Sequence, residues 1–148
     1  MSFKDSSWSA RFAAMGDEAE KVFEEVHPYG WDRFGHNRPA IAVNKLPMKM
    51  RYTPDYRTSF KLVECQGFGK DQTVKVKLDK LLALWLWNND MPVDLFLWNA
   101  TKKRYAYVPL EELTTALHAH AQIDSFPEGT RYWALKADQL ECEWHDVN

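Results

Sequence analysis

Two carboxylates separated by eight residues, Asp55 and Glu64, are the side chains in this sequence best suited to bind a metal ion. Asp55 follows a proline near the end of one extended stretch, and Glu64 interrupts the apolar run of the next. A carboxylate inside an apolar strand is costly unless it is paired or binds a cation, and two neighbouring carboxylates repel unless a cation lies between them. Hard oxygen ligands of this kind suit Mg²⁺ or Mn²⁺.

Further polar residues near this pair could contribute to catalysis. Gln66 lies two residues after Glu64, so in a strand both side chains point to the same side. An amide cannot titrate, so Gln66 can orient a water molecule or hold a phosphate but cannot act as a base. Lys77 and Lys80 follow in a predicted helix, where residues three apart share a face, and either could supply positive charge. The alternative is that Asp55 is a turn residue and Glu64 pairs with a basic residue on an exposed strand.

The hydrophobic spacing predicts a chain in which helices and strands alternate. The predicted helices cover residues 8–26, about 70–87 and 110–121. The predicted strands cover residues 40–46, 50–56, 60–66, 93–98, 104–108, 132–135 and 140–144. This order predicts an α/β protein with a mixed sheet and helices packed on it, in one domain over residues 1–148.

Composition limits where the protein works and what it binds. No apolar run reaches the roughly 18 residues of a membrane span, and the N-terminus does not resemble a secretory signal, so we expect a cytoplasmic protein. Cys65 and Cys142 are expected to be reduced core residues. The net charge is −2, yet residues 38–80 hold ten basic and four acidic side chains. This basic centre favours either a phosphate-facing surface or simply a solvated set of lysines and arginines.

The stretch Pro54-Asp55, an eight-residue gap and Glu64-Cys65-Gln66 resembles the PD-(D/E)xK nuclease motif, with Gln in place of the usual Lys. The resemblance implies a restriction-endonuclease-like αβββαβ core over residues 14–108, followed by a C-terminal extension over 109–148. It also implies that Asp55, Glu64 and the main-chain carbonyl of Cys65 hold Mg²⁺ or Mn²⁺, and that Glu20 reaches the same site from the first helix.

The resemblance implies a metal-dependent DNA endonuclease. Small members of this superfamily include Holliday junction resolvases and phage structure-specific endonucleases, which would imply branched DNA as substrate, a homodimer and, for a phage protein, the host cytoplasm. The residues expected to contact nucleic acid are Arg33, Arg38, Arg51, Arg57, Lys70 and Lys77. Because the motif lysine is replaced, an alternative is an inactive nucleic-acid-binding or assembly protein on the same fold. Action on RNA or on single-strand ends stays open.

Overall fold

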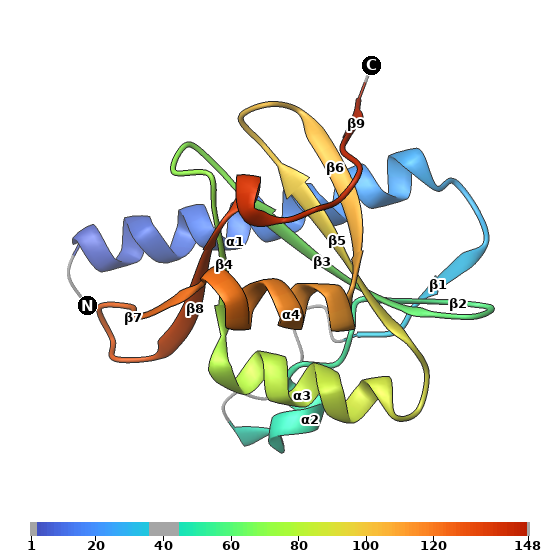
Figure 1. Ribbon diagram of the computed structural model, residues 1–148, viewed down its shortest axis with the longest axis horizontal. Helices are drawn as coiled ribbons and strands as arrows, with labels where there is room; N and C mark the ends of the chain where they lie inside the picture. Colours follow the sequence, from blue (N-terminus) through green and yellow to red (C-terminus); the bar gives the residue numbers. More distant parts are fainter. Residues whose placement is uncertain (1–2, 36–44, 148) are drawn as a thin grey trace.

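The computed structural model describes residues 3–35 and 45–147, with the side chains of the first helix described from Met15 onward. The helices are α1 (Phe3–Val26), α2 (Met48–Arg51), α3 (Leu78–Asn88) and α4 (Leu110–His120), with a short 3-10 helix η2 (Ala137–Gln139). The strands are β1 (Trp31–Arg33), β2 (Tyr56–Thr58), β3 (Leu62–Phe68), β4 (Thr73–Lys77), β5 (Val93–Asn99), β6 (Arg104–Pro109), β7 (Gln122–Ser125), β8 (Arg131–Lys136) and β9 (His145–Asp146) (Figure 1).

Six strands form a central mixed sheet in the order β1-β2-β3-β5-β6-β9. Strands β3 and β5 are parallel, and the other neighbouring pairs are antiparallel. A parallel pair needs a crossover connection, and α3 lies in that connection. Helix α1 covers one face of the sheet, while α3 and α4 lie on the other (Figure 1). The predicted fold class is therefore confirmed: a mixed α/β fold with a central mixed sheet flanked by helices.

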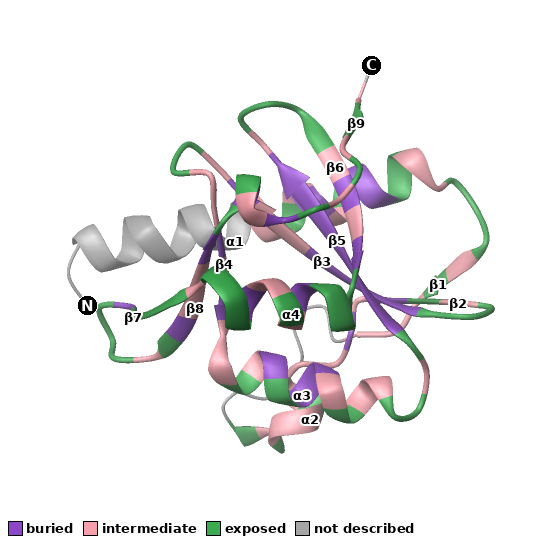
Figure 2. Cartoon of the chain, in the orientation of Figure 1, coloured by how far each residue is buried: buried purple, intermediate pink, exposed green. Residues whose placement is uncertain are grey.

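The position of β5 in the middle of the sheet explains its sequence. Every residue of β5 is buried (Figure 2). Phe96 packs toward α1 with Phe23 and Tyr56, whereas Leu95 packs on the opposite face with Leu84. A strand covered on both faces reads as a continuous apolar run rather than an alternating one, and this is the pattern that predicted the strand.

A second, three-stranded sheet corrects the prediction of one long helix over residues 70–87. Thr73–Lys77 is the strand β4, and this sheet has the order β4-β8-β7. The helix begins only at Leu78. Val74 and Val76 are buried, whereas Thr73, Lys75 and Lys77, which alternate with them, are only partly buried; this is the period of two of a strand. Val74 and Leu78 also fit a spacing of four, so the apolar pattern alone did not separate the two structures.

Several short elements also differ from the prediction. Residues 50–56 are not a strand, because α2 ends at Arg51 and β2 begins only at Tyr56. Residues 140–144 form no strand, and β1 and β7 were not predicted. The predicted strand over 40–46 falls mainly on residues 36–44, which lie outside the described residues, and Lys45 and Leu46 are not in a strand. Strands of two to four residues carry too few side chains for a periodic pattern.

In the described ranges 3–35 and 45–147, none of the helices has the length and apolar character needed to cross a membrane.

Candidate active site

Asp55 and Glu64 are brought together by the hairpin of β2 and β3. Tyr56 pairs with Val63 in the antiparallel register, so the residue before Tyr56 lies beside the residue after Val63. The Asp55 carboxylate accepts a hydrogen bond from the backbone N–H of Cys65, with Oδ2 and N 2.9 Å apart. Both acidic residues therefore lie at the same end of the hairpin.

The main chain of Asp55 is held by the loop that follows β1. The backbone N–H groups of Phe34 and Gly35 donate to the Asp55 carbonyl oxygen at 2.9 and 3.2 Å. Gly35 lies very close to the segment that precedes Asp55: a Cβ at position 35 would be 2.7 Å from the carbonyl oxygen of Pro54. Only glycine fits this approach without displacing the backbone that carries Asp55.

We expect Gly35→Ala to lower the free energy of unfolding by about 1 to 3 kcal/mol, because the new methyl group overlaps backbone atoms that cannot rotate away. Thermal unfolding measures this change. Gly16→Ala is the matched control: a Cβ at Gly16 in α1 meets nothing within 4 Å, and alanine in a helix is more stable than glycine by about 0.5 to 1 kcal/mol. Equal unfolding temperatures for Gly35→Ala and the wild type would contradict the close approach.

Lys80, in the first turn of α3, contacts the polar side chains of β3. Its ammonium lies 2.7 Å from Glu64 Oε2 and donates to Gln66 Oε1 at 3.3 Å. The amide of Gln66 also donates to the backbone carbonyl of Lys75 on β4. Gln66 therefore links β3, β4 and the Lys80 ammonium.

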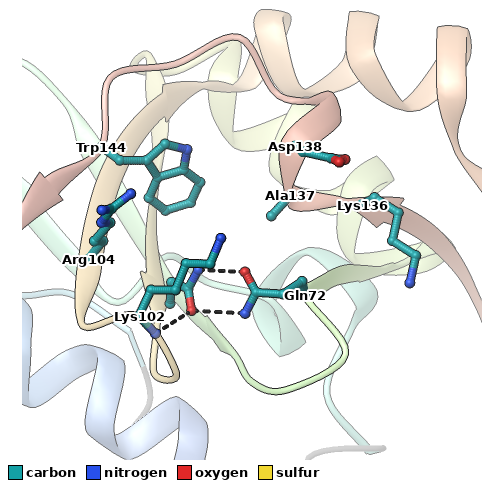
Figure 3. A pocket seen from close by; sticks show the side chains of 8 residues that line it. Gln72, Lys102, Arg104, Lys136, Ala137, Asp138 and Trp144 are labelled. Carbon is teal, nitrogen blue, oxygen red and sulfur yellow. Dashed lines mark hydrogen bonds between the residues drawn. The ribbon is translucent and has the colours of Figure 1, made fainter.

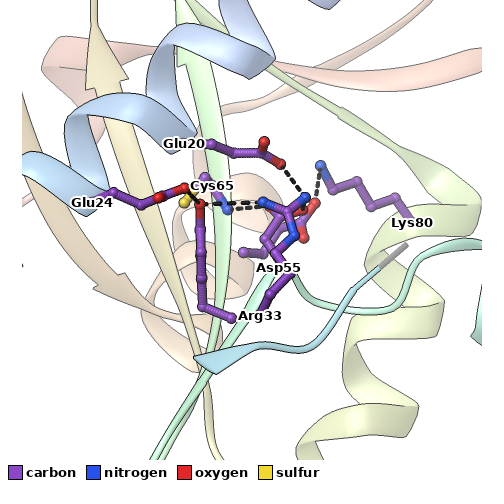
Figure 4. A network of polar contacts seen from close by, with 8 residues as sticks. Glu20, Glu24, Arg33, Asp55, Cys65 and Lys80 are labelled. Carbon is purple, nitrogen blue, oxygen red and sulfur yellow. Dashed lines mark hydrogen bonds and ion pairs between the residues drawn. The ribbon is translucent and has the colours of Figure 1, made fainter. Parts of the chain in front are cut away.

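A second cation, Arg33 on β1, lies among the acidic residues. Its guanidinium is 3.0 Å from Glu20 Oε1 and 3.7 Å from Asp55 Oδ1, and it also donates to the hydroxyl of Tyr56. Figure 4 shows Glu20 on α1, Arg33 and Asp55 converging, with Lys80 approaching from the opposite side. Arg33 is thus an ion-pair partner inside the site, a role that the sequence did not indicate.

The charges of this cluster shift the pKa values of its members. Burial, followed by the carboxylates of Glu64 and Glu20, raises the pKa of Asp55 well above its ordinary value. For Lys80 burial acts to lower the pKa, but the attraction of the Glu64 carboxylate raises it overall. Three carboxylate side chains, those of Glu20, Asp55 and Glu64, thus lie against two cations, Arg33 and Lys80. Shifted pKa values of neighbouring acidic and basic groups, as for Asp55 and Lys80, are typical of functional sites.

A cavity of about 180 Å³ opens beside this cluster. Its lining includes Gln66, Tyr52 and three lysines, Lys75, Lys77 and Lys80. Lys77 is on β4 and Lys80 on α3, so the prediction that they share one helical face is wrong. Both nevertheless line the same cavity, because β4 leads directly into α3. Burial, with the nearby charge of Lys80, lowers the pKa of Lys77.

The other residues expected to contact nucleic acid lie in different surroundings. Arg51 ends α2 and donates to the backbone carbonyl of Leu46. Arg57 is exposed on β2 and pairs with Asp32 at 2.7 Å. Lys70 is exposed between β3 and β4. Arg38 lies outside the described residues.

The donor set of the site fits a divalent cation. Within residues 3–35 and 45–147, no three His, Cys, Asp or Glu side chains form a ready-made metal site. Mg²⁺, however, commonly binds through one or two carboxylates and keeps several waters. The raised pKa of Asp55 reflects buried negative charge next to Glu64, and a cation between the two would relieve that repulsion.

Comparisons with known proteins add one distant likeness. No family model matches the chain, and the curated proteins give no match. Among solved structures, the Holliday junction resolvase Hjc of the archaeal hyperthermophile Archaeoglobus fulgidus aligns over 84% of this chain and 86% of that chain, with 9% identity and a TM-score of 0.46. A likeness of this size carries no argument about activity, which rests on the residues of the site.

Proposed function

We propose that this protein is a metal-dependent endonuclease that hydrolyses phosphodiester bonds in DNA, with branched DNA as its substrate. The observation that supports the proposal best is the meeting of Asp55, Glu64 and the Lys80 ammonium at the end of one hairpin. Two neighbouring acidic groups and one lysine are what metal-assisted phosphodiester hydrolysis needs for binding the ion and for countering the charge of the phosphate.

Asp55 and Glu64 would hold Mg²⁺ or Mn²⁺, with the main-chain carbonyl of Cys65 and the Glu20 carboxylate as the further ligands that the motif implies. When bound, the ion would lower the pKa of a water molecule and neutralise charge that develops on the phosphate. Glu20 already points toward Asp55, and Arg33 pairs with both. Arg33 therefore acts as a positioning residue that keeps these two carboxylates close despite their repulsion.

Lys80 would replace the motif lysine that this chain lacks. Its ammonium lies beside both Glu64 and Gln66, so it can hold a phosphoryl oxygen next to the metal ligands. Gln66 then has a positioning role, because its amide accepts from the Lys80 ammonium and donates to the backbone of β4. Lys77, which lines the adjacent cavity, would hold a neighbouring phosphate of the same strand.

A cleavage assay with Mg²⁺ or Mn²⁺ tests this proposal. We expect the protein to cut a four-way junction or a flap faster than linear duplex or single strand, and to cut nothing when EDTA removes the metal. A homodimer is part of the proposal, because resolving a junction takes two symmetric cuts. Equal cleavage rates on plain duplex would contradict the proposed specificity for branched DNA. Cleavage that persists in the Glu64→Ala variant would contradict the assignment of this site as the active site.

A second candidate function, metal-independent nucleic-acid binding, is favoured by one observation. Lys80 and Arg33 already neutralise much of the carboxylate charge without any metal. If Lys80 and Arg33 take the place of a metal ion, Mg²⁺ should leave the unfolding temperature unchanged. The protein should then bind DNA without cleaving it in the presence of any divalent ion. The endonuclease proposal expects the opposite: a rise in unfolding temperature with Mg²⁺ or Mn²⁺, since a ligand that binds only the folded state stabilises it.

A further inference from the structure

The outer face of the three-stranded sheet carries a row of basic side chains that starts at the candidate active site. Lys75 and Lys77 alternate with the buried Val74 and Val76 on β4, so both point away from the core. Lys136 on β8 is paired directly with Thr73, and residues directly opposite in an antiparallel pair lie on one face. Lys136 donates to the Thr73 hydroxyl at 3.0 Å. The lysines of both strands therefore share this face.

Three neighbouring hollows follow this row and share their lining residues. The cavity beside the active site is lined by Lys75, which also lines a hollow of about 450 Å³ over the outer face of the sheet. That hollow is lined by Lys136, which also lines a further hollow of about 310 Å³. The row of basic side chains consequently continues from Lys80 to Lys102 and Arg104 in the third hollow.

The third hollow adds an aromatic ring to its basic groups. Figure 3 shows Trp144 and Arg104 on one side of it, Lys136 and Asp138 on the other, and Gln72 and Lys102 between them. Trp144 is partly exposed. Cationic side chains next to a solvent-accessible indole are the elements that bind single-stranded nucleic acid, because an unpaired base can stack on the ring while phosphates contact the cations.

A pair of amides holds the floor of the third hollow in place. Gln72 and Asn99 donate to each other's carbonyl oxygens at 3.1 and 2.8 Å, and Asn99 is only 3% exposed. Gln72 has a φ of 51°, which residues other than glycine seldom adopt. Such a conformation persists only where surrounding contacts enforce it, and it occurs most often at functional sites.

Four aspartates on this face offset the charge of most of its basic side chains. Asp71 pairs with Lys75 at 3.3 Å, and Asp146 pairs with Arg104 at 2.9 Å. Asp124 and Asp138 also line the hollows. Exposed ion pairs of this kind are worth about 0 to 1 kcal/mol each, so phosphates can displace the aspartates.

We propose that a single strand of nucleic acid extends from the cleavage centre across the outer face of the β4-β8-β7 sheet to the third hollow. Its phosphates contact Lys136, Lys102 and Arg104, and one unpaired base stacks on Trp144. This inference rests on the proposed nuclease function and adds to it a substrate class: branched DNA that carries a single-stranded tail on one side of the cut.

The test measures binding by fluorescence anisotropy in EDTA, so that no cleavage occurs, with a blunt duplex and with the same duplex carrying a single-stranded tail. We expect the tail to tighten binding to the wild type. Lys136→Glu and Lys102→Glu should each weaken binding of the tailed DNA about tenfold, and each should reduce the dependence of log affinity on log salt by about 0.7. Trp144→Ala should weaken it about fivefold or more through lost stacking.

Arg131→Glu is the matched control, because Arg131 is exposed on the same strand as Lys136 but on the opposite face of the sheet. It should bind both DNAs like the wild type. If Lys136→Glu and Lys102→Glu bind the tailed DNA no more weakly than Arg131→Glu, the proposal is overturned. An equal loss of affinity for blunt duplex also overturns it, since a duplex would then occupy this face.

Binding and cleavage separate this inference from the proposed function. The protein could bind tailed DNA more tightly, lose that binding in these variants and yet cleave nothing with any metal. That result would contradict the nuclease function and support the proposed binding of a single strand on the outer face. Metal-dependent cleavage, combined with variants that bind tailed DNA like the wild type, would support the nuclease function and overturn the proposed binding of a single strand on the outer face.

Discussion

Asp55→Asn and Glu64→Gln are expected to abolish cleavage while changing stability in opposite directions. Each removes a proposed metal ligand, so the rate of Mg²⁺-dependent cleavage should fall at least about 100-fold, the scale on which a group that stabilises charge in the transition state acts. DNA binding in EDTA should remain. The stability effects differ because burial and the Glu64 and Glu20 carboxylates outweigh the attraction of Arg33 at Asp55, whereas Glu64 pairs closely with the Lys80 ammonium.

Asp55→Asn should stabilise the metal-free protein. The pKa of Asp55 is higher in the folded state than in the unfolded chain, because of burial and then the Glu64 and Glu20 carboxylates. The carboxyl group therefore favours folding when it is protonated, and this contribution is lost as the pH rises through the raised pKa. Because the folded state disfavours the charge that this group carries in the unfolded chain at neutral pH, replacing it should add on the order of 1 kcal/mol, and the amide can still accept from the N–H of Cys65.

Glu64→Gln should destabilise the protein by about 2 kcal/mol or more, because it leaves the Lys80 ammonium without its carboxylate partner in a site where the Lys80 side chain is only 16% exposed. Thermal unfolding in EDTA at neutral pH measures both changes. Mg²⁺ should then raise the unfolding temperature of the wild type but of neither variant. An Asp55→Asn variant that unfolds at a lower temperature than the wild type would contradict the statement that the folded protein disfavours the charge of Asp55.

The second large effect concerns Lys80 and Gln66. We expect Lys80→Gln to lower the cleavage rate about 100-fold, because the site loses the only positive charge that reaches both Glu64 and Gln66 among the described residues. The double variant Gln66→Lys with Lys80→Gln should recover much of that rate, since the ammonium then stands at the motif position and the amide takes its place on α3.

The single variants serve as controls for this exchange. Gln66→Lys alone puts a second ammonium next to Lys80, so like-charge repulsion should lower its unfolding temperature. Lys21→Gln changes an exposed lysine on α1 and should leave the cleavage rate unaltered. Single-turnover cleavage rates and melting temperatures of all four variants provide the comparison. A double variant as inactive as Lys80→Gln would show that Lys80 acts through its position on α3 and not through its charge.

Part of the site could be predicted from local sequence because its members are close in the chain. Asp55 and Glu64 are joined by one hairpin, and the register of a hairpin follows from the alternation of its side chains. The apolar run from Leu95 to Trp98 in β5 likewise identified an interior strand, since both faces of that strand are covered.

The charges around the pair could not be predicted in this way. Arg33 and Lys80 reach the acidic residues from β1 and α3, and nothing in the local sequence specifies that these elements converge. The strand β4 was mistaken for a helix because Val74, Val76 and Leu78 suit either period, and the choice depended on pairing with β8, a strand more than 50 residues away.

By itself, the sequence determined the acidic pair, the replacement of the motif lysine by Gln66 and the alternation of helices and strands, because each depends on neighbours in the chain. Only the tertiary structure decided that Lys80 rather than Lys77 contacts Glu64 and that the lysines of β4 and β8 lie on one face. The reason is physical: ion pairs and sheet pairings join groups that are distant in sequence, and their partners are set by the packing of the whole fold.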